Sequence, residues 1–192
     1  MQHVLECAKR LLATTAIIFA ATITNAQNIE YSKADSTKVV SLLKEATTLR
    51  GNTHPMIYFG RKFIGYPYVA HTLERGDKEH LIVNLRQFDC TTFVETVTAL
   101  TLCDQRNQRT FADFCHNLAT LRYRQGKISD YTSRLHYFTW WATDNEQLGI
   151  IKDIAPQQEP WGAFTAVQRI NINYMSNHAS AYKHLLACPD YL

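Results

Sequence analysis

The amino-acid sequence predicts one domain that combines several helices with a few short strands. Residues 36–50 and 89–100 each repeat apolar side chains at the spacing of an amphipathic helix. Between them, residues 80–85 are short, apolar and β-branched, which is typical of a strand running up to the second helix. Apolar residues make up 46% of the chain, and glycine and proline are few, so the chain can bury a core.

The first 26 residues have the pattern of a secretory signal peptide. A basic pair at residues 9–10 precedes an apolar run over residues 11–23, and small residues lead up to Ala26. We therefore expect cleavage near Ala26, one mature domain over residues 27–192, and a periplasmic or secreted location. An uncleaved anchor is the alternative. No later stretch is long and apolar enough to cross a bilayer, so no stable membrane span is expected after cleavage.

Charge and motifs argue against several classes of partner. The formal net charge of +3 is too mild to indicate a nucleic-acid-binding protein. The sequence has no glycine-rich phosphate loop and no motif of metal ligands, so we expect neither a cofactor nor a metal site.

The first predicted helix is followed by an aromatic segment. Residues 36–50 begin at Ser36, a suitable N-cap, and end before a glycine. Residues 56–71 contain two glycines and a proline, so we expect one turn of helix and then an irregular chain. Tyr66 and Tyr68 of this segment are candidates to line a substrate pocket, and core packing is the alternative.

Cys90 lies where the next helix is expected to begin. Asp89 is a good N-cap residue, so Cys90 falls in the first turn, where backbone N–H groups and the helix dipole favour an anion. Such a position lowers the pKa of a thiol, and the thiolate is the reactive form, so Cys90 is the candidate nucleophile. A small buried cysteine at a helix start is the alternative. The apolar face of this helix is expected at Phe93, Val94, Val97 and Leu100.

Three further cysteines, Cys103, Cys115 and Cys188, follow Cys90 in the chain. An exported protein could pair them, but their spacing matches neither a zinc site nor a dense disulfide framework. Buried thiols and a disulfide bridge are equally open interpretations.

A further helix is predicted after Thr110, which forms a capping-box pattern with Asp113. Arg122 in its last turn suits the C-terminus of a helix and requires no ligand. Its buried stripe is expected at Phe111, Phe114, Leu118 and Leu121.

Residues 133–142 crowd a cation, an imidazole and four aromatic side chains into one stretch. We predict a helix capped at Ser133, on which Arg134 and Tyr137 share one side and His136 faces another. This stretch is a candidate substrate wall, with Arg134 placed to bind a carboxylate and Tyr137 beside it. An aromatic helix that packs on the core is the alternative.

The rest of the chain predicts two strands, a turn and a final helix. The strands are expected at residues 148–154 and 165–174, the turn at 175–178 and the helix at 179–186. The two histidines in this part are interpreted as structural or exposed residues.

Four stretches of the chain, taken in order, form a recognisable set: Phe63-Ile-Gly-Tyr-Pro-Tyr, Phe88-Asp-Cys-Thr-Thr-Phe-Val-Glu95, Ser133-Arg-Leu-His-Tyr137 and Ile172-Asn-Tyr-Met-Ser176. Together they resemble the N-acetylmuramoyl-L-alanine amidase-like branch of the NlpC/P60 superfamily of cysteine hydrolases. The resemblance implies an α+β fold with a papain-like core, in which the cysteine helix packs against an antiparallel sheet that carries the histidine. It also implies hydrolysis of amide bonds in peptidoglycan stem peptides, with peptidoglycan or a muropeptide as partner and Cys90 as nucleophile.

The sequence departs from the superfamily at the catalytic base. There the base follows the cysteine on a later strand, in a His-Val-Gly-like setting, and none of His136, His178 and His184 has that setting. We therefore expect the amino-terminal part of such a domain, with an incomplete sheet and little amidase activity. Two other functions stay open: a non-catalytic module that binds cell-wall peptides, and a papain- or transglutaminase-like enzyme that uses Cys90 with His136.

Overall fold

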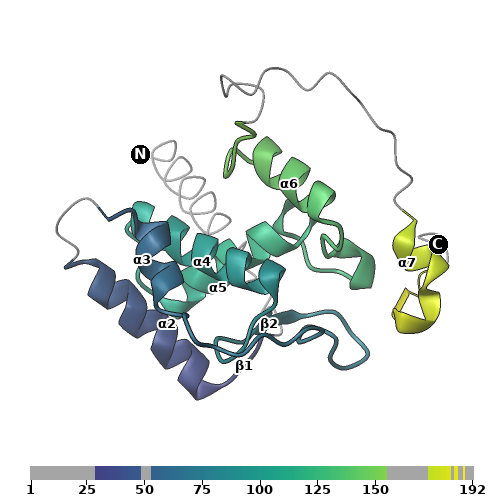
Figure 1. Ribbon diagram of the computed structural model, residues 1–192, viewed down its shortest axis with the longest axis horizontal. Helices are drawn as coiled ribbons and strands as arrows, with labels where there is room; N and C mark the ends of the chain where they lie inside the picture. Colours follow the sequence, from purple (N-terminus) through teal and green to yellow (C-terminus); the bar gives the residue numbers. More distant parts are fainter. Residues whose placement is uncertain (1–28, 49–52, 155–172, 183, 186–187, 189–192) are drawn as a thin grey trace, which may run out of the picture.

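The computed structural model describes residues 29–48, 53–154, 173–182, 184–185 and 188 (Figure 1). The predicted signal peptide and most of the predicted strand at residues 165–174 lie outside these ranges. Within them, none of the helices is long and apolar enough to span a membrane.

The chain begins with strand β1 (Ile29–Tyr31) and helix α2 (Lys33–Ala46). Ser32 caps this helix, since its hydroxyl accepts a hydrogen bond from Asp35 N at 3.2 Å and the Asp35 carboxylate accepts one from Ser32 N at 3.0 Å. The predicted cap at Ser36 is therefore wrong, because the reciprocal pair starts the helix four residues earlier. Asp35 also accepts a hydrogen bond from Leu85 N, which joins the start of α2 to the chain beyond the second strand.

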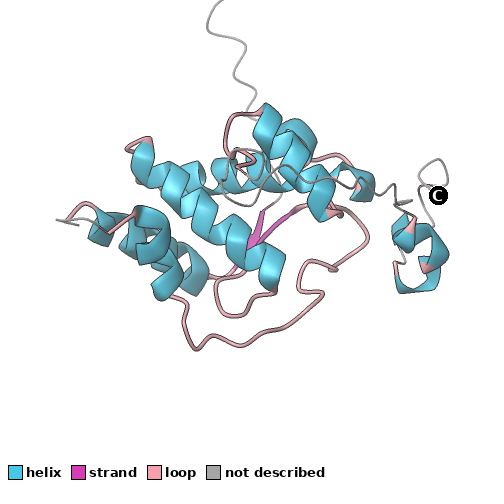
Figure 2. Cartoon of the chain, turned by 45° about the horizontal axis from the view of Figure 1, so that its top comes forward, coloured by secondary structure: helices cyan, strands magenta, loops and turns pink. Residues whose placement is uncertain are grey.

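The aromatic segment and the sheet follow. Helix α3 (Pro55–Arg61) is the predicted turn of helix, and the chain after it is irregular, as expected. Strand β2 (Leu81–Val83) lies inside the predicted strand and pairs with β1 in parallel, with Ile29 opposite Leu81. Figure 2 shows the two strands side by side among the helices. The resemblance implied an antiparallel sheet, whereas the sheet in the described ranges is this parallel pair, so the papain-like fold stays a prediction.

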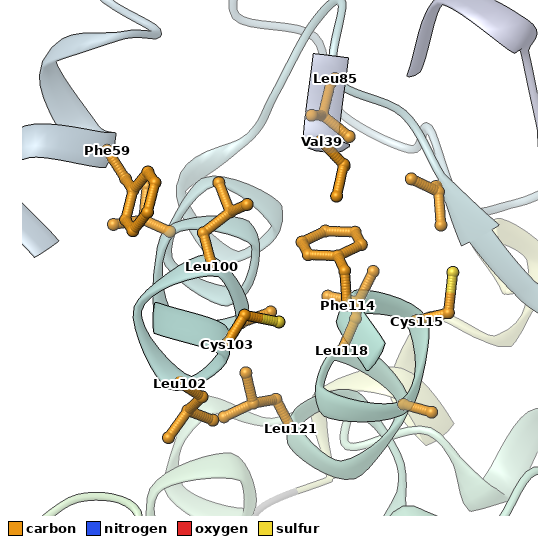
Figure 3. Packing of buried hydrophobic residues seen from close by; sticks show 14 of the residues in the cluster. Val39, Phe59, Leu85, Leu100, Leu102, Cys103, Phe114, Cys115, Leu118 and Leu121 are labelled. Carbon is orange, nitrogen blue, oxygen red and sulfur yellow. The ribbon is translucent and has the colours of Figure 1, made fainter. Parts of the chain in front are cut away.

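Helices α4 (Cys90–Gln105) and α5 (Phe111–Arg122) form the centre of the molecule. Asp89 and Thr110 cap these helices, as predicted, and the predicted capping box of Thr110 with Asp113 is present. Asp89 forms a second capping box, with Thr92. Val94 is exposed although it was predicted on the apolar face, and the consecutive residues 95–103 are buried, so this part of α4 is covered on all sides. Figure 3 shows side chains of α4 and α5 meeting beneath residues of α2 and the chain after β2. These include Val39, Leu85, Leu100, Cys103, Phe114 and Leu118.

The aromatic stretch after α5 differs from its prediction. Two 3₁₀ turns, η1 (Arg124–Gly126) and η2 (Tyr131–Ser133), precede Arg134, which is extended and forms a bridge with Tyr123. The predicted helix cap at Ser133 is wrong, because its hydroxyl donates a hydrogen bond to Asp130 O inside the turn. Helix α6 begins only at Phe138 (Phe138–Gln147), so Arg134 is extended and His136 lies in irregular chain, and neither belongs to a helix.

The last described residues also correct the predictions. Residues 148–154 form a turn and irregular chain in place of a strand, because Gly149 adopts a positive φ of 69° directly after α6. A short helix, α7 (Tyr174–Asn177), stands where a turn was expected, and a 3₁₀ turn, η4 (Ala179–Ala181), opens the predicted final helix. Met175 of α7 packs with Tyr131 in a second, smaller apolar cluster.

Candidate active site

Cys90 is the first residue of the sixteen-residue helix α4, and its side chain is exposed. The Asp89 carboxylate accepts a hydrogen bond from Thr92 N at 2.8 Å and fixes the start of the helix. The Cys90 sulfur lies 3.9 Å from the Thr91 hydroxyl. The exposed thiol therefore stands at the positive end of a helix dipole, where an anion such as a thiolate is favoured.

A pocket of about 270 Å³ opens beside this thiol. Its walls come from residues 68–74, the start of α4, the end of α5, residues 134–136 and Tyr182. Segments far apart in the sequence therefore meet at the cysteine. The predicted site residues that line this pocket together are Tyr68, Cys90, Arg134 and His136.

Tyr66 and Tyr137, the other two predicted site residues, do not line this pocket. The Tyr66 ring packs edge-on against Phe63, with ring centroids 5.6 Å apart. The Tyr137 hydroxyl accepts a hydrogen bond from Met175 N at 3.0 Å, and its ring packs edge-on against Trp140. Both rings therefore have packing roles in this structure, and their contact with substrate stays a prediction.

His136 shares the pocket with Cys90 but is engaged elsewhere. Its Nε2 lies 2.7 Å from the Tyr131 carbonyl oxygen, and because that oxygen can only accept, Nε2 carries the proton. The imidazole packs on the Tyr131 ring at 4.3 Å. Burial, together with the nearby Arg134 guanidinium, lowers the pKa of His136 to about 4, so the ring is neutral near pH 7. Within the described ranges, no hydrogen bond joins His136 to the Cys90 sulfur.

This buried imidazole makes stability depend on pH. The pKa of His136 is about 4 in the folded protein and 6.5 for a free side chain, so the unfolded chain binds more protons between these values. The contribution of the neutral His136 side chain to folding stability is complete above pH 6.5 and is lost as the pH falls toward 4. Between pH 7 and pH 5, the free energy of unfolding should fall by about 2 kcal/mol more in the wild type than in His136→Gln. Urea unfolding at both pH values measures the difference, and equal falls in the two proteins would contradict the assignment.

Arg134 is held by protein carboxylates. Its Nη2 donates a hydrogen bond to Glu74 Oε1 at 2.8 Å, and its Nε lies 3.6 Å from Glu79 Oε1. The guanidinium also lies over the Tyr131 ring, 5.0 Å from the centroid. The sequence predicted a substrate carboxylate at Arg134, and the structure shows glutamate side chains of the protein beside it.

An ion pair in the pocket wall escaped the sequence analysis. Arg122 Nε lies 2.7 Å from Glu95 Oε2, and Arg122 Nη1 donates a hydrogen bond to Ile82 O at 2.7 Å. Both side chains line the Cys90 pocket and are almost fully buried. Burial raises the pKa of Glu95, and the Arg122 guanidinium opposes that rise. Arg122 lies in the last turn of α5, as predicted, and its side chain also turns inward to tie α4 and α5 to β2, which the sequence analysis did not foresee.

The four cysteines in the described ranges are all free, so no bridge joins them. Cys103 and Cys115 are buried, as one of the two interpretations held, and burial raises their pKa values to about 11 and about 12. Burial also raises the pKa of Cys188. Among the residues that the structure describes, no group of three or more histidine, cysteine or acidic residues could hold a metal ion.

Comparisons with known proteins identify relatives of this chain. A crystal structure of an N-acetylmuramoyl-L-alanine amidase from Bacteroides uniformis ATCC 8492 is 38% identical, with a TM-score of 0.63, and the match covers 72% of this chain and 57% of that one. Another crystal structure with the same description and source is 40% identical, with a TM-score of 0.61, and the match covers 69% of this chain and 53% of the other.

A Bacteroides fragilis protein described as a candidate xylanase is 41% identical over 66% of this chain and 52% of its own length, with a TM-score of 0.58. The chain thus spans little more than half the length of these solved structures. No curated protein shows significant similarity to the chain.

Residues 58–192 match the family profile described as AmiA-like, N-acetylmuramoyl-L-alanine amidase-like. Since this match covers well over half of the sequence, the chain belongs to the N-acetylmuramoyl-L-alanine amidase-like family.

Proposed function

We propose that the protein is an exported cysteine hydrolase that cleaves amide bonds in peptidoglycan stem peptides, with Cys90 as its nucleophile. One observation carries the proposal: an exposed thiol at the N-terminus of a long helix lines a pocket in a chain of the amidase-like family. The proposal includes a papain-like α+β fold, membership of the NlpC/P60 superfamily and export through the signal-like residues 1–26.

The chemistry follows from the position of the thiol. The Cys90 thiolate attacks the carbonyl carbon of the scissile amide, and backbone N–H groups in the first turn of α4 stabilise the oxyanion. The C–N bond breaks as the leaving nitrogen takes a proton, which leaves a thioester on Cys90. Water then hydrolyses the thioester and restores the thiol.

The reaction also needs a base that takes the thiol proton and returns it to the leaving amine. His136 is a candidate for this role, because it lines the same pocket, as His71 also does, and its Nδ1 is unprotonated. In the superfamily that the sequence resembles, the base comes from a later strand. We therefore propose His136 as the alternative to a base from such a strand.

A second function, binding of cell-wall peptides without cleavage, is favoured by a specific observation. Within the described part of the chain, the Cys90 sulfur has no hydrogen bond to an imidazole, and the pKa of His136 is too low for an efficient base near pH 7. A pocket without an active base could still hold a stem peptide.

Incubation with purified muropeptides, followed by mass spectrometry, separates these functions. The hydrolase predicts products that differ from the substrate by one water added across an amide bond. Saturable binding of intact muropeptides with no such product would support the binding module, and neither cleavage nor binding would refute both.

A further inference from the structure

The Arg134 guanidinium has more hydrogen-bond donors than the protein uses. It carries five N–H groups, and two of them form hydrogen bonds, with Leu73 O at 3.4 Å and Glu74 Oε1 at 2.8 Å. Its Nε is buried without a hydrogen-bond partner, because Glu79 Oε1 is 3.6 Å away. The side chain is only 6% exposed, yet it lines the pocket that contains Cys90. A buried cation with unused donors in a pocket wall is suited to a planar carboxylate, which a guanidinium can bind through two N–H groups.

The two glutamates beside Arg134 are not equivalent. The Glu79 side chain is 7% exposed, and it accepts a hydrogen bond from the Tyr123 hydroxyl at 2.8 Å, so its position is fixed from two sides. The Glu74 side chain is 31% exposed and belongs to an exposed segment between the Cys90 pocket and a second cavity of about 250 Å³. Glu74 can therefore move into solvent, whereas Glu79 cannot leave without breaking its partly buried hydrogen bond to Tyr123.

We propose that Arg134 is a carboxylate-binding site in the wall of the Cys90 pocket, that Glu74 occupies it in the free protein, and that a ligand carboxylate displaces Glu74. Arg134 already faces two carboxylates, so a third would be repelled unless one of them left. The ligand class is a peptide with a free carboxylate that lies beside the amide bond presented to Cys90. This inference rests on the proposed function for the identity of the ligand, and on the geometry of Arg134 for the site.

Binding of N-acetylmuramoyl-L-alanyl-D-isoglutamine, which carries one free carboxylate, tests the proposal. Isothermal titration calorimetry in a Cys90→Ala background prevents turnover. Glu74→Gln should bind this muropeptide about tenfold more tightly, because the ligand no longer competes with a resident carboxylate. Glu74→Asp, which keeps the charge on a shorter side chain, should give an intermediate affinity. Glu45→Gln is the matched control, because Glu45 forms an exposed ion pair with Lys62 at 2.8 Å, outside the pocket, and should leave affinity unchanged.

Two further arms identify the group that is bound. The carboxamide analogue of the same muropeptide should gain nothing from Glu74→Gln, and adding Arg134→Gln to Glu74→Gln should abolish the gain for the acid. Unchanged or weaker binding by Glu74→Gln would overturn the proposal, as would an equal gain for the carboxamide or no binding by any variant. A protein with Cys90 intact that binds the acid in this pattern but does not cleave muropeptides would refute the proposed hydrolysis alone.

Discussion

Replacing Cys90 with alanine is expected to abolish the cleavage of muropeptide amide bonds. The substitution removes the sulfur that attacks the carbonyl and leaves the start of α4 intact, because the helix is capped by Asp89 and Thr92. Loss of a covalent nucleophile lowers kcat by about 10⁴-fold or more in comparable hydrolases. Mass spectrometric rates of amide cleavage, measured for the wild type and Cys90→Ala at equal concentration, give the ratio.

Cys188→Ser is the control for this substitution. Cys188 is a free thiol that does not line the Cys90 pocket, so its removal should leave the rate unchanged. Binding of intact muropeptide should also survive in Cys90→Ala, because the walls of the pocket are untouched. Cleavage by Cys90→Ala at the wild-type rate would show that another group performs the chemistry.

Breaking the buried Glu95–Arg122 pair is expected to destabilise the fold strongly. Both side chains are about 3% exposed, and their N···O distance is 2.7 Å. Arg122→Met would leave the Glu95 carboxylate without its partner and would also remove the hydrogen bond to Ile82 O. Removing one member of a buried ion pair typically costs about 3–5 kcal/mol. Urea denaturation of the wild type and Arg122→Met measures the loss.

The double variant Glu95→Leu/Arg122→Met distinguishes an unpaired charge from lost packing. It removes both charges, so it should be more stable than Arg122→Met alone. The exposed Glu45–Lys62 pair, 45% and 35% exposed, is the matched comparison, and Lys62→Met should cost about 1 kcal/mol or less. If Arg122→Met were as mild as Lys62→Met, the pair would not hold α4 and α5 to β2.

The elements that sequence predicted well have signals confined to a few neighbouring residues. Thr110 and Asp113 are three residues apart, so the start of α5 is encoded locally, and their predicted capping box was confirmed. The predicted N-cap of α4 at Asp89 was confirmed as well. The same locality placed Cys90 at the first position of α4. Strand β1 has only three residues and depends on its pairing with β2, so its own sequence gives little signal.

The parts that sequence missed depend on partners distant in the chain. Arg134 was predicted on a helix capped at Ser133, but its bridge with Tyr123 makes the chain extended at this residue. Glu95 and Arg122 are 27 residues apart, and neither side chain alone indicates that the other neutralises it in the interior.

Brief alkylation with iodoacetamide at pH 7, followed by peptide mapping, shows whether Cys90 is the reactive thiol of this protein. Cys103 and Cys115 are buried, with pKa values raised to about 11 and about 12, and the pKa of Cys188 is also raised, whereas Cys90 is exposed at a helix N-terminus. A denatured sample, in which all thiols react, is the control. We predict that Cys90 is carbamidomethylated well before the other three. An unreactive Cys90, or earlier labelling of Cys103, Cys115 or Cys188, would contradict the assignment of Cys90 as the nucleophile.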